Sequence, residues 1–150
     1  MSTKNLINSA IYERNKNNII KQYDMVMGDM NEDLLKIIFK DNFNVELNKT
    51  TYRHPMDFEN KEMSMYIEVK SRNINHNKYP TTMVGVNKFE FAHNCGRDVY
   101  FIFMFNDGNF YYKYNKNDTF EIECGGRNDR GMNEYNDYVY IPIEKLTKLN

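Results

Sequence analysis

Two acidic side chains and one lysine in the segment HPMDFENKEMSMYIEVKSR, residues 54–72, have types and spacing that could do chemistry. Asp57 lies near the start of a short predicted strand, and the turn-like residues ENKE separate it from a second strand that carries Glu68 and Lys70. A chain that folds back at this turn brings Asp57 beside the other two side chains. The sequence therefore predicts a hairpin with three ionisable groups close together.

Such a group is suited to a metal ion and a phosphate. Mg²⁺ takes one or two protein carboxylates together with waters and substrate phosphate, so converging Asp57 and Glu68 would form the anionic pocket that it prefers. Lys70 follows Glu68 by two residues and projects to the same side of the strand. There a lysine can stabilise a developing phosphorane charge, or help to orient and deprotonate an attacking water.

The strand that carries Glu68 and Lys70 has two different faces. The apolar side chains alternate with the polar ones, so that Met63, Met65, Ile67 and Val69 share one face and Tyr66, Glu68 and Lys70 share the other. An amphipathic helix is predicted before it, over Asn18–Lys40, from apolar residues at intervals of three and four. Gly28 leaves open two shorter helices that meet near it.

Further elements follow the same logic. We expect a first strand through Phe43, Val45 and Leu47, and a helix through MVGVNKFEFAHN that Thr81 or Thr82 caps and that stops at Gly96. DVYFIFMF is typical of a central strand covered on both faces, and Asp107-Gly108 indicates a hairpin turn into FYYKYN. TFEIEC, YVYIPI and EKLTKL complete the order. This pattern predicts an α/β or α+β fold, with a central mixed β-sheet flanked by helices.

The motif residues resemble the core of the PD-(D/E)xK nuclease superfamily, which includes restriction enzymes, Holliday-junction resolvases and phage or viral nucleases. Pro55 and Asp57 match the first half of the pattern, with Met56 between them, and Glu68-Val69-Lys70 match the second half. The resemblance covers roughly Gly28 to Phe105 and implies a restriction-endonuclease-like core. It also implies an Mg²⁺-dependent (or Mn²⁺-dependent) DNA endonuclease that leaves a 5′-phosphate and acts as a homodimer, with no organic cofactor.

The resemblance assigns roles to further residues. An acidic residue on the helix before the sheet reaches the metal site in such nucleases, and Glu32 is the matching candidate ahead of Asp29 and Asp33. Lys88 occupies the place of the polar or basic residue that supports the site from the following helix. The implied catalytic set is therefore Asp57, Glu68, Lys70 and Lys88, and the implied metal ligands are Glu32, Asp57 and Glu68.

Three arginines are candidates for DNA binding. Arg72 follows the motif strand, where it could hold a phosphate, although an arginine at a strand end is commonly just solvated. Arg127 and Arg130 belong to GGRNDRG, which could grip a DNA backbone or could equally be a glycine-rich turn between strands. Because the formal net charge is -1, any basic surface must be local.

Length and composition bound the remaining possibilities. The 150 residues, 41% of them hydrophobic, predict one folded domain over residues 1–150. Two cysteines without CxxC spacing fit a reducing compartment. No apolar run approaches the ~20 residues of a membrane span and no secretory signal is present. We therefore expect an intracellular protein without membrane partners, cytoplasmic or nuclear, or in a host cell or virion if it is viral.

Two other classes of function remain open. A non-catalytic structural or virion-associated protein could keep a nuclease-like fold, and the near-neutral charge favours it modestly. A DNA-binding module without cleavage would show salt-dependent affinity and no metal requirement. Convergence of Asp57, Glu68 and Lys70 on an open groove would favour the nuclease.

Overall fold

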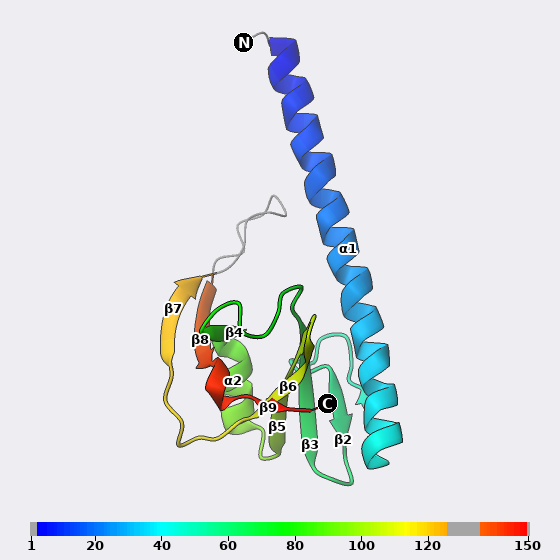
Figure 1. The fold of residues 1–150 in the computed structure, drawn as a ribbon, viewed down its shortest axis with the longest axis vertical. Coiled ribbons are helices and arrows are strands. Elements are labelled where there is room, and N and C mark those ends of the chain that lie inside the picture. The colour runs from blue at the N-terminus through cyan, green and yellow to red at the C-terminus, as the bar shows by residue number, and fades with distance from the viewer. Residues whose placement is uncertain (1–2, 126–135, 150) are drawn as a thin grey trace.

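A long N-terminal helix comes first, and a second, shorter helix lies between the fourth and fifth strands (Figure 1). A computed structural model describes residues 3–125 and 136–149, and the side chains of residues 16–125 and 136–149. The elements are α1 (Thr3–Phe43), β1 (Asn48–Lys49), β2 (Phe58–Asn60), β3 (Met65–Ser71), β4 (Thr81–Gly85), α2 (Val86–Asn94), β5 (Asp98–Phe105), β6 (Gly108–Lys113), β7 (Glu121–Gly125), β8 (Asn136–Pro142), a 3₁₀ turn (Ile143–Lys145) and β9 (Thr147–Lys148).

The strands form two sheets. The larger sheet has the order β1-β2-β3-β5-β6-β9, and the smaller one has the order β4-β8-β7. β3 and β5 are parallel because β4 and α2 make the crossover between them, whereas the other described pairs are antiparallel. The predicted α+β class with a mixed sheet and flanking helices is confirmed, and the separate three-stranded sheet is an addition to it.

The two faces of β3 and β5 serve two different cores. Met65, Ile67 and Val69 pack with Leu35 of α1, as the alternation in the sequence predicts. On β5, alternate residues belong to the α1 side and to the side covered by α2 and the smaller sheet. Glu68 and Lys70 lie on the same face of β3 as Tyr66, which packs against the core on the side of α2 and the smaller sheet. Their side chains therefore face α2.

The helix before the sheet is longer than its apolar pattern predicts. α1 is continuous from Thr3 to Phe43 and passes through Gly28 without a break. Its N-terminal part extends beyond the two sheets (Figure 1). Asn44 ends it by adopting a left-handed conformation (φ 53°), and its N–H donates to the Lys40 carbonyl at 3.1 Å. Over its described residues neither α1 nor α2 is long and apolar enough to cross a membrane.

Two predicted elements are wrong in detail. The chain around Phe43, Val45 and Leu47 does not form a strand, because α1 continues to Phe43 and pairing with β2 begins only at Asn48. Thr81 and Thr82 do not cap a helix. They begin β4, which pairs with β8 through Thr82 opposite Ile141 and buries alternate side chains, and the helix starts only at Val86.

Both predicted hairpins are confirmed. β2 pairs with β3 in antiparallel register, with residues 61–64 as the turn. β5 returns into β6 through Asn106 and Asp107, and Gly108 has a φ of 155° that favours glycine. The first hairpin positions Asp57 and Glu68, and the second forms one side of the cleft described below.

Candidate active site

The β2–β3 hairpin places Asp57 across from Glu68. Phe58 is paired with Ile67, so Asp57, one residue earlier, lies opposite Glu68 on the neighbouring strand. Asp57 is also fixed to β3 by its side chain, because its Oδ2 accepts a hydrogen bond of 2.8 Å from the backbone N of Val69. The fold thus brings the two acidic residues of the motif together, as the sequence predicts.

Glu68 is a buried carboxylate between two lysines. Its side chain is 5% exposed, Lys70 Nζ lies 3.2 Å from Oε1, and Lys88 Nζ lies 3.5 Å from Oε2. Oε2 is nonetheless without a hydrogen-bond partner among the described residues. A buried carboxylate oxygen that lacks such a partner is rare in folded proteins, and an ordered water, a bound ion or a ligand can satisfy it.

Burial raises the pKa of Glu68 above its ordinary value, and the negative charge of Asp57 adds to the shift. Lys70 and Lys88 act in the opposite direction, since each favours the ionised carboxylate, but they do not cancel the loss of solvation. The site therefore combines a desolvated acid, a second acid and two ammonium groups. This combination is typical of catalytic sites and less common in solvated strand faces.

Lys88 enters the site from the first turns of α2. Besides its ion pair with Glu68, its Nζ donates to the carbonyl oxygen of Pro55, the residue two before Asp57. One side chain therefore connects three parts of the predicted site, namely α2, the segment before β2, and β3. The supporting role that the family resemblance implies for Lys88 stays a prediction.

Glu32 lies close to the site without joining it directly. Its carboxylate pairs with Lys49 at 3.5 Å, and its pKa is raised by burial and by the charge of Asp57. Among the described residues, no three His, Cys, Asp or Glu side chains form a group that could hold a metal ion. The role of Glu32 as a third metal ligand stays a prediction.

Two carboxylates are nevertheless a sufficient protein contribution for Mg²⁺. This ion usually keeps several waters and takes one or two carboxylates together with substrate phosphate. Asp57 and Glu68 supply such a set, and the buried Oε2 of Glu68 is an acceptor that a cation would satisfy. The residues present therefore fit a divalent cation.

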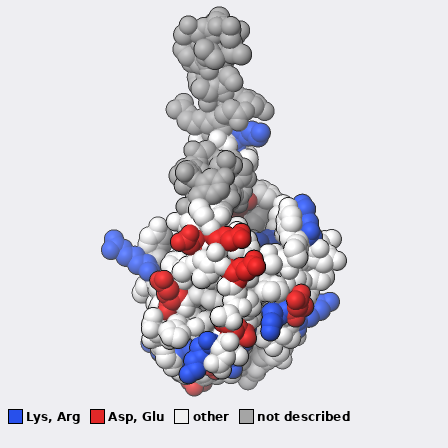
Figure 2. Space-filling view, turned by 90° about the vertical axis from the view of Figure 1, so that its left-hand side faces the viewer, with Lys and Arg blue, Asp and Glu red and all other residues white. Residues whose placement is uncertain are grey.

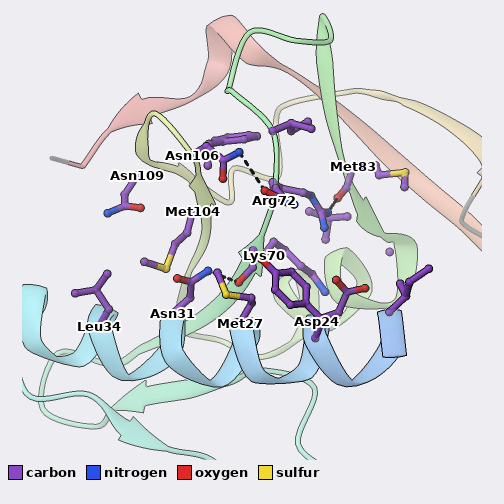
Figure 3. A pocket seen from close by; sticks show the side chains of 18 of the residues that line it. Asp24, Met27, Asn31, Leu34, Lys70, Arg72, Met83, Met104, Asn106 and Asn109 are labelled. Atoms are coloured by element: carbon purple, nitrogen blue, oxygen red, sulfur yellow. Dashed lines mark hydrogen bonds between the residues drawn. The ribbon is translucent and has the colours of Figure 1, made fainter. Parts of the chain in front are cut away.

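A cleft of about 970 Å³ opens beside Lys70 (Figure 3). It lies between α1 and the ends of β3, β4 and β5, and both Lys70 and Arg72 line it. Arg72 Nη2 donates to the Met83 carbonyl at 2.7 Å, which ties the end of β3 to β4. Lys70 thus connects the buried carboxylate to an open cavity, whereas Arg72 holds the wall of that cavity.

Other polar groups of the cleft were not identified from the sequence. Asn31 of α1 donates to Ser71 Oγ at 2.8 Å, and Asn106 donates to Asn73 Oδ1 at 3.2 Å. These residues are far apart in the chain and follow no motif, so only the fold shows that they share a cavity. Arg127 and Arg130 lie outside the described residues.

Comparison with known proteins shows a match to a protein family. A family model described as "Phage putative PDDEXK endonuclease" matches residues 20–149. No match was found among curated proteins or among solved structures. The matched range contains the whole β2–β3 hairpin, both lysines and most of α1.

Proposed function

The chain belongs to the family of phage PDDEXK endonucleases, and from this premise we propose that it is a metal-dependent endonuclease that hydrolyses phosphodiester bonds in DNA. The observation that carries the proposal is the buried Glu68 carboxylate. It lies across from Asp57 and between two lysines, with one oxygen that has no hydrogen-bond partner among the described residues. A strand face that served stability alone would avoid this arrangement, since desolvating a carboxylate is costly.

We assign Asp57 and Glu68 to the metal and Lys70 to the reacting phosphate. Bound Mg²⁺ would polarise the phosphoryl oxygens and lower the pKa of a bound water. Asp57 is oriented for this role by its hydrogen bond to Val69, and Glu68 is oriented by its position in the middle of β3. We further propose that Glu32 completes the acidic set, since its pKa is raised by burial and by the charge of Asp57.

The Lys70 ammonium can contact Glu68 and a phosphate in the cleft at the same time. It has three N–H donors, and Glu68 lies 3.2 Å away on one side while the cleft lies on the other. A phosphate in the cleft would therefore meet a cation that the carboxylate keeps in place. Lys88, which contacts Glu68 and the Pro55 carbonyl, is a positioning residue in this scheme.

The decisive experiment is cleavage of plasmid, single-stranded and four-way-junction DNA by the wild type beside Lys70→Ala. We expect Mg²⁺- or Mn²⁺-dependent products with 5′-phosphate ends, no products in EDTA, and a loss of roughly 100-fold or more in the variant. Lys61→Ala is the matched control, because Lys61 is 77% exposed on the same hairpin. Cleavage that survives Lys70→Ala or Glu68→Ala would overturn the assignment.

A DNA-binding protein without cleavage is the second candidate, and the two ion pairs of Glu68 favour it. They neutralise the buried carboxylate without a metal, as a purely structural strand pair would. Such a protein would bind DNA with a strong salt dependence and would be indifferent to Mg²⁺. The same cleavage assay separates the two functions.

We also propose that the active form is a homodimer. The described residues of one chain offer one such site, and cutting both strands of a duplex requires two. Light scattering of the purified protein measures the mass, and plasmid products report the outcome. A dimer should convert supercoiled plasmid directly to the linear form, whereas a monomer should accumulate the nicked form.

A further inference from the structure

The cleft beside Lys70 has two apolar walls. Met27 and Leu34 of α1 lie on one side, and Met83 of β4 and Met104 of β5 lie across from them (Figure 3). Tyr23 of α1 also lines the cleft. Tyr23 is 54% exposed and Leu34 is 46% exposed, so these side chains are not buried in the core and can contact a ligand. Flat apolar groups suit such walls, and an aromatic ring offers a surface for stacking.

Polar amide side chains lie along the same cleft. Asn73 and Asn106 are exposed and share one hydrogen bond of 3.2 Å, and Asn109 follows on β6. A carboxamide has two N–H donors and an acceptor oxygen with two lone pairs, so one bond leaves Asn73 and Asn106 with further capacity. Amide groups beside stacking surfaces are suited to the edges of nucleic-acid bases.

The walls are held by hydrogen bonds between elements. Arg72 N donates to the Met104 carbonyl at 2.9 Å, and Asn106 N donates to the Ile74 carbonyl at 3.0 Å. Beyond them, Asp107 accepts from both the backbone and the ring of His76, at 2.8 and 2.6 Å. The segment after β3 is therefore fastened to the β5–β6 turn, so this side of the cleft is formed in advance of binding.

The size of the cleft favours a single strand over a duplex. A volume of about 970 Å³ is at the upper end of the range for small-molecule sites, which is enough for unstacked nucleotides. A compact space of that volume is roughly 10 Å across. It is too narrow to enclose a B-DNA duplex, because the major groove of the duplex alone is ~12 Å wide. A duplex would have to remain outside, whereas unpaired bases could enter.

The acidic charge of the face that carries β7 also favours the cleft as the path of the DNA. Acidic side chains gather on the face seen in Figure 2, and the basic ones there are scattered. The strand β7 on that side carries Glu121 and Glu123, both exposed, and Asp137 of β8 is exposed as well. A phosphate backbone would be repelled there, whereas the cleft is lined by two cations, Lys70 and Arg72, against one carboxylate, that of Asp24.

We propose that this cleft binds an unpaired segment of DNA next to the phosphate that is cut, so that the substrate is single-stranded DNA or DNA with an unpaired region. The inference rests on the proposed function, because Lys70 belongs to both the cleft and the site. Bases lie between the apolar walls, the amide groups contact base edges, and the backbone runs toward Lys70.

Binding is tested apart from cleavage, in EDTA and at physiological salt. Fluorescence anisotropy would compare a labelled oligothymidylate with a labelled duplex of the same length on the full chain. We expect the single strand to bind at least tenfold more tightly. Tyr23→Ala should weaken single-strand binding roughly tenfold through lost stacking. The matched control is Tyr52→Ala, since Tyr52 is fully exposed and does not line the cleft.

A second variant tests the amide groups without removing volume. Asn106→Asp adds a negative charge to the cleft and should weaken single-strand binding, whereas Asn117→Asp adds the same charge at an exposed turn and should change it less than twofold. Circular dichroism checks that each variant is folded. Equal or tighter binding of the duplex, or unchanged binding by both cleft variants, would overturn the inference.

The two proposals fail in different ways. Single-strand binding that depends on Tyr23 and Asn106, without Mg²⁺-dependent cleavage, would remove the proposed function and keep only the binding of unpaired DNA by the cleft. Metal-dependent cutting of duplex DNA with no single-strand preference would do the opposite. Light scattering adds a third outcome: if Tyr23→Ala abolishes self-association and leaves DNA binding unchanged, the cleft holds a second copy of the chain and the inference is wrong.

Discussion

Asp57 Oδ2 accepts a hydrogen bond of 2.8 Å from the backbone N of Val69, the residue that separates Glu68 from Lys70. The side chain of one motif half is thereby tied to the backbone of the other half. Because this bond uses one carboxylate oxygen, the orientation of Asp57 and the register of the hairpin are linked. Charge and hydrogen bonding at Asp57 can therefore be separated by substitution.

Asp57→Asn should keep the fold and lose the activity. The amide oxygen can still accept from Val69, but the neutral group is a poor Mg²⁺ ligand. We expect cleavage to fall roughly 100-fold or more, since a metal contributes several kcal/mol to such a transition state. Asp57→Ala should in addition lower the free energy of unfolding by about 1–3 kcal/mol, because the N–H of Val69 loses its acceptor. Plasmid cleavage and urea denaturation measure the two effects, and equal stability of the two variants would contradict this account.

Glu68→Gln should inactivate the protein and stabilise it. Burial raises the pKa of Glu68 in the folded state above its ordinary value of 4.5, so ionised Glu68 opposes folding. This penalty is absent below the unfolded pKa, grows as pH rises through the folded pKa, and is full above it. We therefore expect a higher Tm at pH 7, by about 2–4 °C for each kcal/mol gained.

The difference in Tm between wild type and Glu68→Gln should disappear as pH falls toward 4.5, since both side chains are then neutral. Glu62→Gln on the same hairpin is the control, because Glu62 is exposed and its substitution should leave Tm unchanged. A lower Tm for Glu68→Gln at pH 7 would mean that the two lysines stabilise the carboxylate more than burial destabilises it.

Lys88→Met should move the acid limb of the pH–rate profile to higher pH. The charge of Lys88 lowers the pKa of Glu68, so its removal raises that pKa further and makes the metal-binding form available only at higher pH. Lys61→Met, on an exposed lysine that pairs with Glu59 at 3.9 Å, should leave the limb in place. A uniform loss of rate at every pH would instead indicate that Lys88 contacts the DNA.

The motif hairpin could be predicted because all of its information is local. Alternation along Met65–Val69 defines the two faces, and ENKE defines the turn, so the approach of Asp57 to Glu68 follows from neighbouring residues. β4 could not be predicted in this way. The residues TTMVG suit a helix cap as well as a strand, and pairing with β8, far away in the chain, decides between them.

The cleft could not be predicted from the sequence either. Asn31, Asn73, Asn106 and Asn109 come from α1, a loop, a turn and β6, and asparagine is common throughout this chain. Nothing in their spacing indicates a shared cavity. The N-terminal extension of α1 was missed for a different reason. The polar residues ERNKNN, 13–18, interrupt the apolar repeat, although Leu6, Ile7, Ala10 and Ile11 recur at helical spacing before them. The prediction of a single domain stays untested.

Leu35→Ala tests whether α1 packs on β3 through the face that carries Leu35. Leu35 is fully buried against β3, in the same core as Ile67 and Val69, and Asn31 one turn earlier donates to Ser71. We expect the free energy of unfolding to fall by about 2–5 kcal/mol, as for other buried leucines. Ile37→Ala on the same helix is the control, because Ile37 is 57% exposed and its loss should change stability by less than about 0.5 kcal/mol. Urea denaturation measures both, and equal effects of the two substitutions would show that α1 is packed on a different face in solution.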